Sequence, residues 1–597
     1  MRDIFPHFTL SLTLPLPPPS NYSISLNWKS KVDSRMGPPF KQLSTWQETA
    51  KQMQEHRDST IAAVQPPIPK VPEDLPLNVT HLPKQLLTAR EIELTESPPE
   101  RLVSDLASGL LTATEVTNAF LRRAGLAQRL TNCVTELLAG RAAQRAASLD
   151  AWFAAHGTPT GPLHGLPVSV KEHVGMAGLD LNAGFVGWVG RVADHDALLL
   201  AALWRAGAVF FVRSTEPQTL MHLETSGNLF GATVCPFNRA LTAGGSSGGE
   251  GALLGLRGSC LGVGTDIGGS IRSPAANNGV YGLRPTSFRL PTEGIMATML
   301  AEEQIIPVIG PLSTSLEGIK LFMKAVIDQK PWRHQVSLLP IPWRFDSDWL
   351  PKDETGKTRL KIAVLKDDGI VKPHPPVLRA LNSVEEKLKG IDGVEVIEWK
   401  PYKHDLAWEI IASLYFCDGG REEKEAIDAS GEPWRPLSKF IITDNPYVKH
   451  HSIEQVWEWT MKREKYKEEY NQIWNKTATG VDEFGIPTGT VDVILCPVGP
   501  GAAPPLDHAR YWAYTSQWNL LDYPALVFPV TTVSQQLDKK DENYEPRNEK
   551  DKYNHDMYEP TKYKDAPIAL QLVGRRYDDE KVIQALEFIK QHVKLPL

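Results

Sequence analysis

Cysteine is scarce in this chain of 597 residues, and long apolar runs are missing. The five cysteines lie far apart and form no C-x-x-C pair, which argues against a disulfide framework and against a zinc site. Such usage is typical of a reducing compartment, and we predict a cytoplasmic location. No stretch reaches the roughly 18 consecutive apolar residues of a membrane-spanning helix, so no transmembrane segment is expected.

Positive charge is not in excess either. The chain has 64 Lys and Arg against 71 Asp and Glu, a net charge of −7. This balance provides no basic surface for nucleic acid, so nucleic-acid binding is not expected. A hydrophobic content of 42% and a charged content of 23% are typical of a soluble globular protein.

The chain divides into three parts. Residues 1–40 include FTLSLTLPLPPPS, which is short and interrupted by prolines, so we expect a disordered extension, or a true start at Met36, rather than a signal peptide. Residues 41–100 predict a helical segment and a proline-rich linker. Residues 101–597 form the main domain, in which the highly charged stretch 534–565 predicts a solvated surface loop.

Short apolar strands alternate with helices in the main domain. LPVSV (166–170) and VFFV (209–212) predict strands on either side of a helix over 196–208. Further buried strands are predicted at 492–497 and 525–530. This alternation indicates an α/β fold with a parallel or mixed sheet.

Glycine is concentrated in one region. Between Gly244 and Gly282 the chain places 13 of its 44 glycines, nine of them in AGGSSGGEGA and GVGTDIGGSIRSP. Because glycine loses much conformational entropy on folding, such density implies that the backbone approaches another group closely or adopts unusual dihedral angles. A phosphate site is disfavoured: there is no G-K-[ST], and Ile267 stands where G-x-G-x-x-G requires its third glycine.

Acyl transfer explains the glycines, serines and a lysine together. Ser270 follows two glycines, which places its hydroxyl beside unhindered N–H groups. Lys171 ends an apolar strand, where desolvation lowers the pKa of an amine and allows it to act as a base. Ser246 or Ser247 is positioned to pass a proton between Lys171 and Ser270.

Two histidines near Lys171 suggest a different mechanism. His164 and His173 flank the lysine and raise the alternative of a Ser-His-Asp triad. No G-x-S-x-G motif with a suitable partner accompanies them, so we interpret both as structural.

PVSVKE, GGSSGGEGAL and GVGTDIGGSIRSPAANNGVYGLRPT, in this order, resemble the amidase signature family, and within it the fungal acetamidases and, more distantly, fatty acid amide hydrolase. The resemblance covers residues 40 to 597. It implies a central mixed β-sheet covered by helices on both faces. It also implies a Ser-Ser-Lys triad: Ser270 as nucleophile, Ser246, after a cis peptide, as the middle member, and Lys171 as the base. Many relatives have Asp where this chain has Glu172.

The resemblance implies further roles around this triad. Backbone N–H groups form an oxyanion hole, polar side chains brace the two glycine loops, and an apolar residue lines the substrate pocket. The oxyanion hole comprises the N–H groups of Ile267, Gly268, Gly269 and Ser270. The bracing residues are Ser247, Asp266 and Arg272, and the pocket residue is Leu220.

The implied reaction is hydrolysis of a carboxamide, with an acetamide-like short-chain amide as substrate, through an acyl-enzyme and without metal or cofactor. Three alternatives remain: a hydrolase of long-chain or aryl amides, an amidotransferase subunit, and an inactive binding protein. A small-molecule amide is the expected partner, and a homodimer is left open.

Overall fold

The computed structural model describes residues 40–345 and 347–596. The extension expected over residues 1–40 therefore lies, apart from Phe40, outside the described residues. The segment 41–100 contains helices, as its sequence pattern predicts, and the longest of them is α1, Trp46–Ala62.

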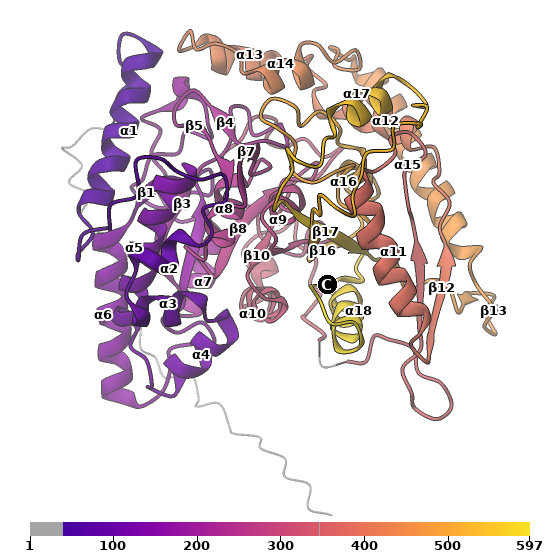
Figure 1. Cartoon of the computed structure of the whole chain (residues 1–597), viewed down its shortest axis with the longest axis horizontal. Helices are drawn as coiled ribbons and strands as arrows, with labels where there is room; N and C mark the ends of the chain where they lie inside the picture. Colours follow the sequence, from indigo (N-terminus) through magenta and orange to yellow (C-terminus); the bar gives the residue numbers. More distant parts are fainter. Residues whose placement is uncertain (1–39, 346, 597) are drawn as a thin grey trace, which may run out of the picture.

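An 11-stranded sheet runs through the molecule in the order β1-β3-β2-β8-β10-β9-β16-β17-β15-β11-β12 (Figure 1). Parallel pairing joins β2 to β3 and β8, and β11 to β12 and β15, whereas the other neighbours are antiparallel. The strands are β1 Val134–Leu137, β2 Pro167–Lys171, β3 Val209–Ser214, β8 Leu261–Asp266, β9 Tyr281–Arg284, β10 Val308–Ser313, β11 Leu360–Val364, β12 Val394–Glu398, β15 Val493–Pro497, β16 Ala525–Thr532 and β17 Pro567–Val573.

Three two-stranded ribbons lie outside this sheet. They are β4 Ser226–Gly227 with β5 Gly231–Ala232, β6 Val234–Cys235 with β7 Asn238–Thr242, and β13 Gly480–Val481 with β14 Pro487–Thr488.

Helices flank the sheet: α6 packs on β3, α8 on β8, α9 on β16 and α11 on β17 (Figure 1). Besides α1 they are α2 Leu82–Leu86, α3 Ala89–Glu96, α4 Pro99–Ala107, α5 Ala113–Thr131, α6 Ala139–His156, α7 Leu198–Arg205, α8 Gly248–Gly255, α9 Arg272–Asn277, α10 Leu316–Ile327, α11 Pro375–Lys389, α12 His404–Tyr415, α13 Arg421–Asp428, α14 Pro436–Ile442, α15 Ile453–Asn475, α16 Ala513–Leu521, α17 Glu549–Met557 and α18 Asp579–His592. Short 3-10 helices cover Val186–Trp188 and Pro331–Arg333. The predicted α/β fold with a central mixed sheet is confirmed.

The glycine-rich region brings α8 directly against β8. A Cβ atom on Gly262 of β8 would lie 2.0 Å from Glu250 Oε2 of α8. A Cβ atom on Gly249 would lie 2.4 Å from the backbone nitrogen of Thr215, just beyond β3. Side chains at these positions would separate the helix from the sheet, so the glycines permit close backbone packing.

The charged stretch 534–565 differs from the solvated loop expected from its composition. It contains α17, and the side chains of Asp538 and Asp551 are fully buried. Arg379 donates to both carboxylate oxygens of Asp538, and backbone N–H groups donate to Asp551. Most residues of the stretch are nevertheless exposed, as the charge composition predicts, and the two buried carboxylates are tolerated because enough donors surround them.

Within the described ranges, no helix combines the length and the apolar character needed to cross a membrane.

Candidate active site

Lys171 lies at the end of β2, a strand whose five residues are all buried. Pairing on both sides, with β3 and β8, explains why the strand is apolar up to this lysine. The Lys171 side chain is inaccessible to solvent, and its Nζ lies 2.6 Å from Ser246 Oγ and 3.1 Å from Thr265 Oγ1. The lysine and the first serine of GGSSGG are therefore in direct contact.

Burial lowers the pKa of the Lys171 amine to about 8 from an ordinary value of 10.5. The carboxyl groups of Glu216 and Asp266 oppose this effect, because negative charge favours the ammonium form. The result is an amine that is partly neutral near neutral pH, as its place at the end of an apolar strand predicts.

The glycine loop AGGSSGG connects β7 to α8 and carries Ser246 and Ser247. The peptide bond between Gly245 and Ser246 is cis, as the family resemblance implies. The Ser247 N–H donates to the carbonyl oxygen of Ser270 at 3.1 Å, and the Ser247 hydroxyl lies 3.3 Å from both the carbonyl oxygen and the nitrogen of Thr265. Ser247 therefore joins the loop of Ser246 to the end of β8 and to the loop of Ser270.

Ser270 occupies the turn between β8 and α9 and retains 5% exposure. Within residues 40–345 and 347–596 its hydroxyl group makes no hydrogen bond, to Ser246 or to any other group. The structure thus links Lys171 to Ser246 by side chains, and Ser247 to Ser270 by a backbone hydrogen bond.

The four N–H groups expected to form an oxyanion hole are not equivalent. The Gly269 N–H donates to Asp266 Oδ1 at 2.9 Å. In the described part of the chain, the N–H groups of Ile267, Gly268 and Ser270 donate to no protein group. The Gly269 N–H therefore serves a carboxylate that shapes the turn, and the oxyanion-hole role of the four N–H groups stays a prediction.

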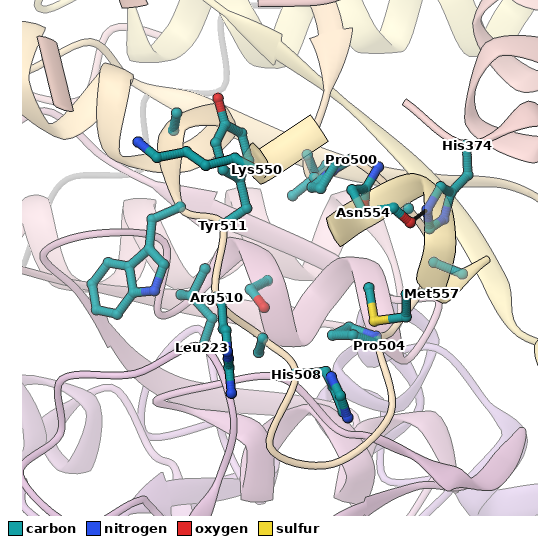
Figure 2. A pocket seen from close by; sticks show the side chains of 18 of the residues that line it. Leu223, His374, Pro500, Pro504, His508, Arg510, Tyr511, Lys550, Asn554 and Met557 are labelled. Atoms are coloured by element: carbon teal, nitrogen blue, oxygen red, sulfur yellow. Dashed lines mark hydrogen bonds between the residues drawn. The ribbon is translucent and has the colours of Figure 1, made fainter. Parts of the chain in front are cut away.

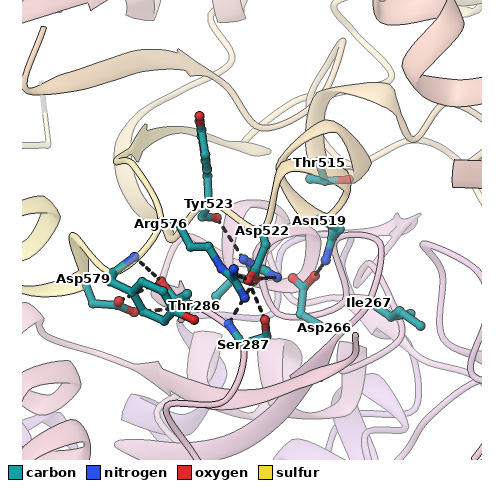
Figure 3. Close-up of polar contacts among 12 residues, drawn as sticks. Asp266, Ile267, Thr286, Ser287, Thr515, Asn519, Asp522, Tyr523, Arg576 and Asp579 are labelled. Atoms are coloured by element: carbon teal, nitrogen blue, oxygen red, sulfur yellow. Dashed lines mark hydrogen bonds and ion pairs between the residues drawn. The ribbon is translucent and has the colours of Figure 1, made fainter. Parts of the chain in front are cut away.

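Asp266 and Arg272 form a buried pair that braces this turn. The Arg272 guanidinium donates to both carboxylate oxygens of Asp266, at 3.0 Å each, and to the carbonyl oxygen of Thr515 in α16. Asn519, also in α16, reaches the same carboxylate at 2.9 Å (Figure 3). Burial raises the pKa of Asp266, but the charge and hydrogen bonds of Arg272, together with the Asn519 hydrogen bond and the Arg284 charge, outweigh it and lower that pKa to about 2.

Several residues of this site were not singled out from the sequence. They are Thr265, which contacts Lys171, and Thr515 and Asn519 of α16, which hold the turn that carries Ser270. Only Thr265 carries a sequence signal, because it stands inside GVGTD. Thr515 and Asn519 lie more than two hundred positions from the glycine loops and follow no motif.

A cavity of about 320 Å³ adjoins the turn that carries Ser270. Ser273, one helical turn beyond Ser270, lines it, although Ser270 itself does not. Trp512 also lines it and touches the turn, because a Cβ atom on Gly268 would lie 2.9 Å from its ring. The lining is mostly apolar, and side chains of the loop 498–512 and of α17 surround the cavity (Figure 2).

Leu220 does not line this cavity. It is buried with φ of 60° and packs with Phe185, Trp188 and Ile427. The pocket role implied by the resemblance therefore has no counterpart in the cavity beside Ser270. The described residues also contain no cluster of His, Cys, Asp and Glu suited to hold a metal ion.

The family model for Amidase matches residues 115–583 of this chain. The chain belongs to the amidase family. It is 39% identical over 512 residues to an acetamidase of Emericella nidulans, covering 85% of this chain and 92% of that protein. It is 38% identical over 515 residues to an acetamidase of Aspergillus oryzae, covering 86% of this chain and 93% of that protein.

A solved structure titled fatty acid amide hydrolase superposes with a TM-score of 0.84 at 34% identity, covering 92% of this chain and 95% of that one. These relatives confirm the family inferred from the glycine loops, and this amidase is a hydrolase that acts on carboxamides.

Proposed function

We propose that this amidase hydrolyses its substrate through a Lys171–Ser246–Ser270 triad and a covalent acyl-enzyme. The observation that carries the proposal is the 2.6 Å contact between Lys171 Nζ and Ser246 Oγ, both buried. Ser270 is the remaining member, and its hydroxyl makes no hydrogen bond within the described residues, which leaves it free to react with a substrate.

The steps follow from these groups. The Ser270 hydroxyl passes its proton to Ser246, whose own proton moves to the neutral Lys171 amine, while Ser270 Oγ bonds to the amide carbon. Lys171 returns a proton through Ser246 to the amide nitrogen, so the C–N bond breaks and ammonia or an amine leaves. Water then attacks the ester on Ser270 by the same proton path, releases the acid and restores the hydroxyl.

The negative charge on the tetrahedral oxygen requires donors. We assign this role to the N–H groups of Ile267, Gly268 and Ser270, which have no partner within the described residues. Preorganised donors of this kind contribute about 3 kcal/mol each in mutational tests on other acyl-transfer enzymes.

The deciding experiment replaces Ser270 by Ala and assays short, long-chain and aromatic amides. We expect the loss of hydrolysis for every substrate, and a wild-type mass increase equal to one acyl group when the reaction is quenched. Ser148→Ala, on the exposed side of α6, is the matched control and should retain the full rate. Retained hydrolysis in Ser270→Ala would refute the proposed nucleophile.

The substrate itself remains a proposal. Similarity to the two acetamidases supports a short-chain amide. The 320 Å³ apolar cavity supports the alternative, a long-chain or aryl amide, since acetamide presents a single methyl group to it.

A variant that fills the cavity distinguishes the short-chain amide from the long-chain or aryl amide as substrate. Ala276 of α9 lines it, and Ala276→Phe should slow hydrolysis of bulky amides while leaving acetamide turnover nearly unchanged. Ala147→Phe on the exposed face of α6 is the control. Equal losses for both substrates would argue against the cavity as the acyl pocket.

We propose further that the enzyme acts without a partner subunit of another kind. An amidotransferase subunit would require its complex, so activity of the purified chain is the test. Gel filtration of the active fraction then separates a monomer from a homodimer.

A further inference from the structure

His173 has no part in the proton path above, yet it is 97% buried two positions beyond Lys171, at 3% exposure. Its Nδ1 lies 2.8 Å from the carbonyl oxygen of Met296, and its Nε2 lies 2.9 Å from Thr265 Oγ1. The same Thr265 oxygen lies 3.1 Å from Lys171 Nζ. One hydroxyl group therefore stands between the histidine and the lysine.

The Met296 carbonyl determines which ring nitrogen of His173 carries the proton. A carbonyl oxygen only accepts, so the His173 Nδ1 must be the protonated nitrogen. In the neutral ring Nε2 is then an acceptor, and the Thr265 hydroxyl donates its proton to it. The Thr265 oxygen keeps its lone pairs, and they accept an N–H from Lys171.

This arrangement orients the amine. Neutral Lys171 has two N–H groups and one lone pair. With an N–H directed to Thr265, the lone pair is free to turn toward Ser246, which lies 2.6 Å away. Without His173 as its acceptor, the Thr265 hydroxyl could donate its proton to Lys171 instead. It would then compete with the Ser246 hydroxyl for the lone pair of the amine.

We propose that His173 is a positioning residue of this amidase, which acts through the Thr265 hydroxyl to aim the lone pair of Lys171 at Ser246. This role rests on the proposed function, because it has meaning only if Lys171 is the base.

The charges around the two side chains agree with a neutral imidazole. Burial lowers the pKa of His173 well below its usual range, and the positive charges of Lys171 and Arg213 act in the same direction. The carboxyl groups that face Lys171 are those of Glu216, Asp266, Glu250 and Glu172, and none of them accepts a hydrogen bond from the His173 ring.

The test uses the full-length protein and three variants. Thr265→Val removes the hydroxyl at nearly constant shape. His173→Asn keeps an N–H near the Nδ1 position for Met296 and removes the Nε2 acceptor. Thr265→Ser retains the hydroxyl. Rates are measured above about pH 9, where Lys171 with a pKa of about 8 is mostly neutral. A small shift of this pKa in a variant then does not affect the rate.

We expect kcat to fall by about 10- to 100-fold in Thr265→Val and in His173→Asn with KM unchanged, the size of effect that misplacing a catalytic group produces. Thr265→Ser should recover most of the rate. Because His173 acts only through Thr265, the double variant should be no slower than Thr265→Val alone.

Three results would overturn the role of His173: multiplicative losses in the double variant, a full rate per folded molecule in His173→Asn, or a change in KM alone. Melting curves establish the folded fraction. Wild type and Lys171→Ala are assayed in parallel. Full activity of Lys171→Ala would refute the proposed triad. An inactive Lys171→Ala together with full activity of His173→Asn would refute only the role of His173.

Discussion

Lowering the pH should switch this amidase off, because the base that we propose, Lys171, must be neutral to accept a proton. Burial places the pKa of Lys171 at about 8, well below the ordinary 10.5. At pH 7 about one molecule in ten then carries the neutral amine, and at pH 6 about one in a hundred. A lysine with its ordinary pKa would be neutral in only about one molecule in three thousand at pH 7.

The assay is kcat/KM against pH for one amide, since this ratio reports the free enzyme. We expect a tenfold fall for each pH unit below about 8 and a plateau above it. Lys171→Ala should be inactive throughout, whereas Lys361→Ala on β11, outside the site, should retain the wild-type profile. A constant kcat/KM between about pH 6 and 9 would refute the role of Lys171 as base. A rise in kcat/KM centred near pH 10.5 would refute the lowered pKa.

Stability changes in the same direction and needs its own measurement. The unfolded chain binds the Lys171 proton more tightly than the folded chain, so the free energy of unfolding rises as pH increases from about 8 to 10.5. Melting temperatures measured from about pH 6 to about pH 10.5 separate a loss of folded protein from the loss of catalysis expected below about pH 8.

Three further predictions concern the frame of the site. Arg272→Leu leaves the Asp266 carboxylate buried without its partner and should lower the free energy of unfolding by about 3–5 kcal/mol in urea titration. The control Arg90→Leu, which breaks two exposed ion pairs, should change it by less than about 1 kcal/mol. Asp551→Ala removes the acceptor of two backbone N–H groups, so it should lower the free energy of unfolding by about 1–3 kcal/mol and make the stretch 534–565 more sensitive to protease than in the wild type. Because the proposed triad needs no metal, a chelator should leave the rate unchanged, and a loss restored by added metal would contradict it.

Local sequence patterns predicted much of the sheet. The apolar runs at 166–170 and 209–212 became β2 and β3, since a strand buried on both faces requires continuous apolar residues. Charge composition was a weaker guide, as the buried Asp538 and Asp551 show.

The candidate site divides in a similar way. Lys171, Ser246 and Ser270 were accessible from sequence because their motifs are contiguous. The bracing contact between Asp266 and Arg272 spans a single turn and was accessible for the same reason. His173 was interpreted as structural, since nothing near it in the chain indicates the Thr265 hydroxyl.

By itself, then, the sequence determined the strands and the glycine loops and indicated the side chains that we propose as reacting groups, because backbone propensity and close packing depend on neighbouring residues. Tertiary structure alone decided which groups surround them: Thr265 meets His173 across 92 positions, and Asn519 meets Asp266 across 253. A buried polar group requires a hydrogen-bond partner. Which residue becomes the partner depends on which distant segments pack together, and the neighbouring sequence does not indicate this.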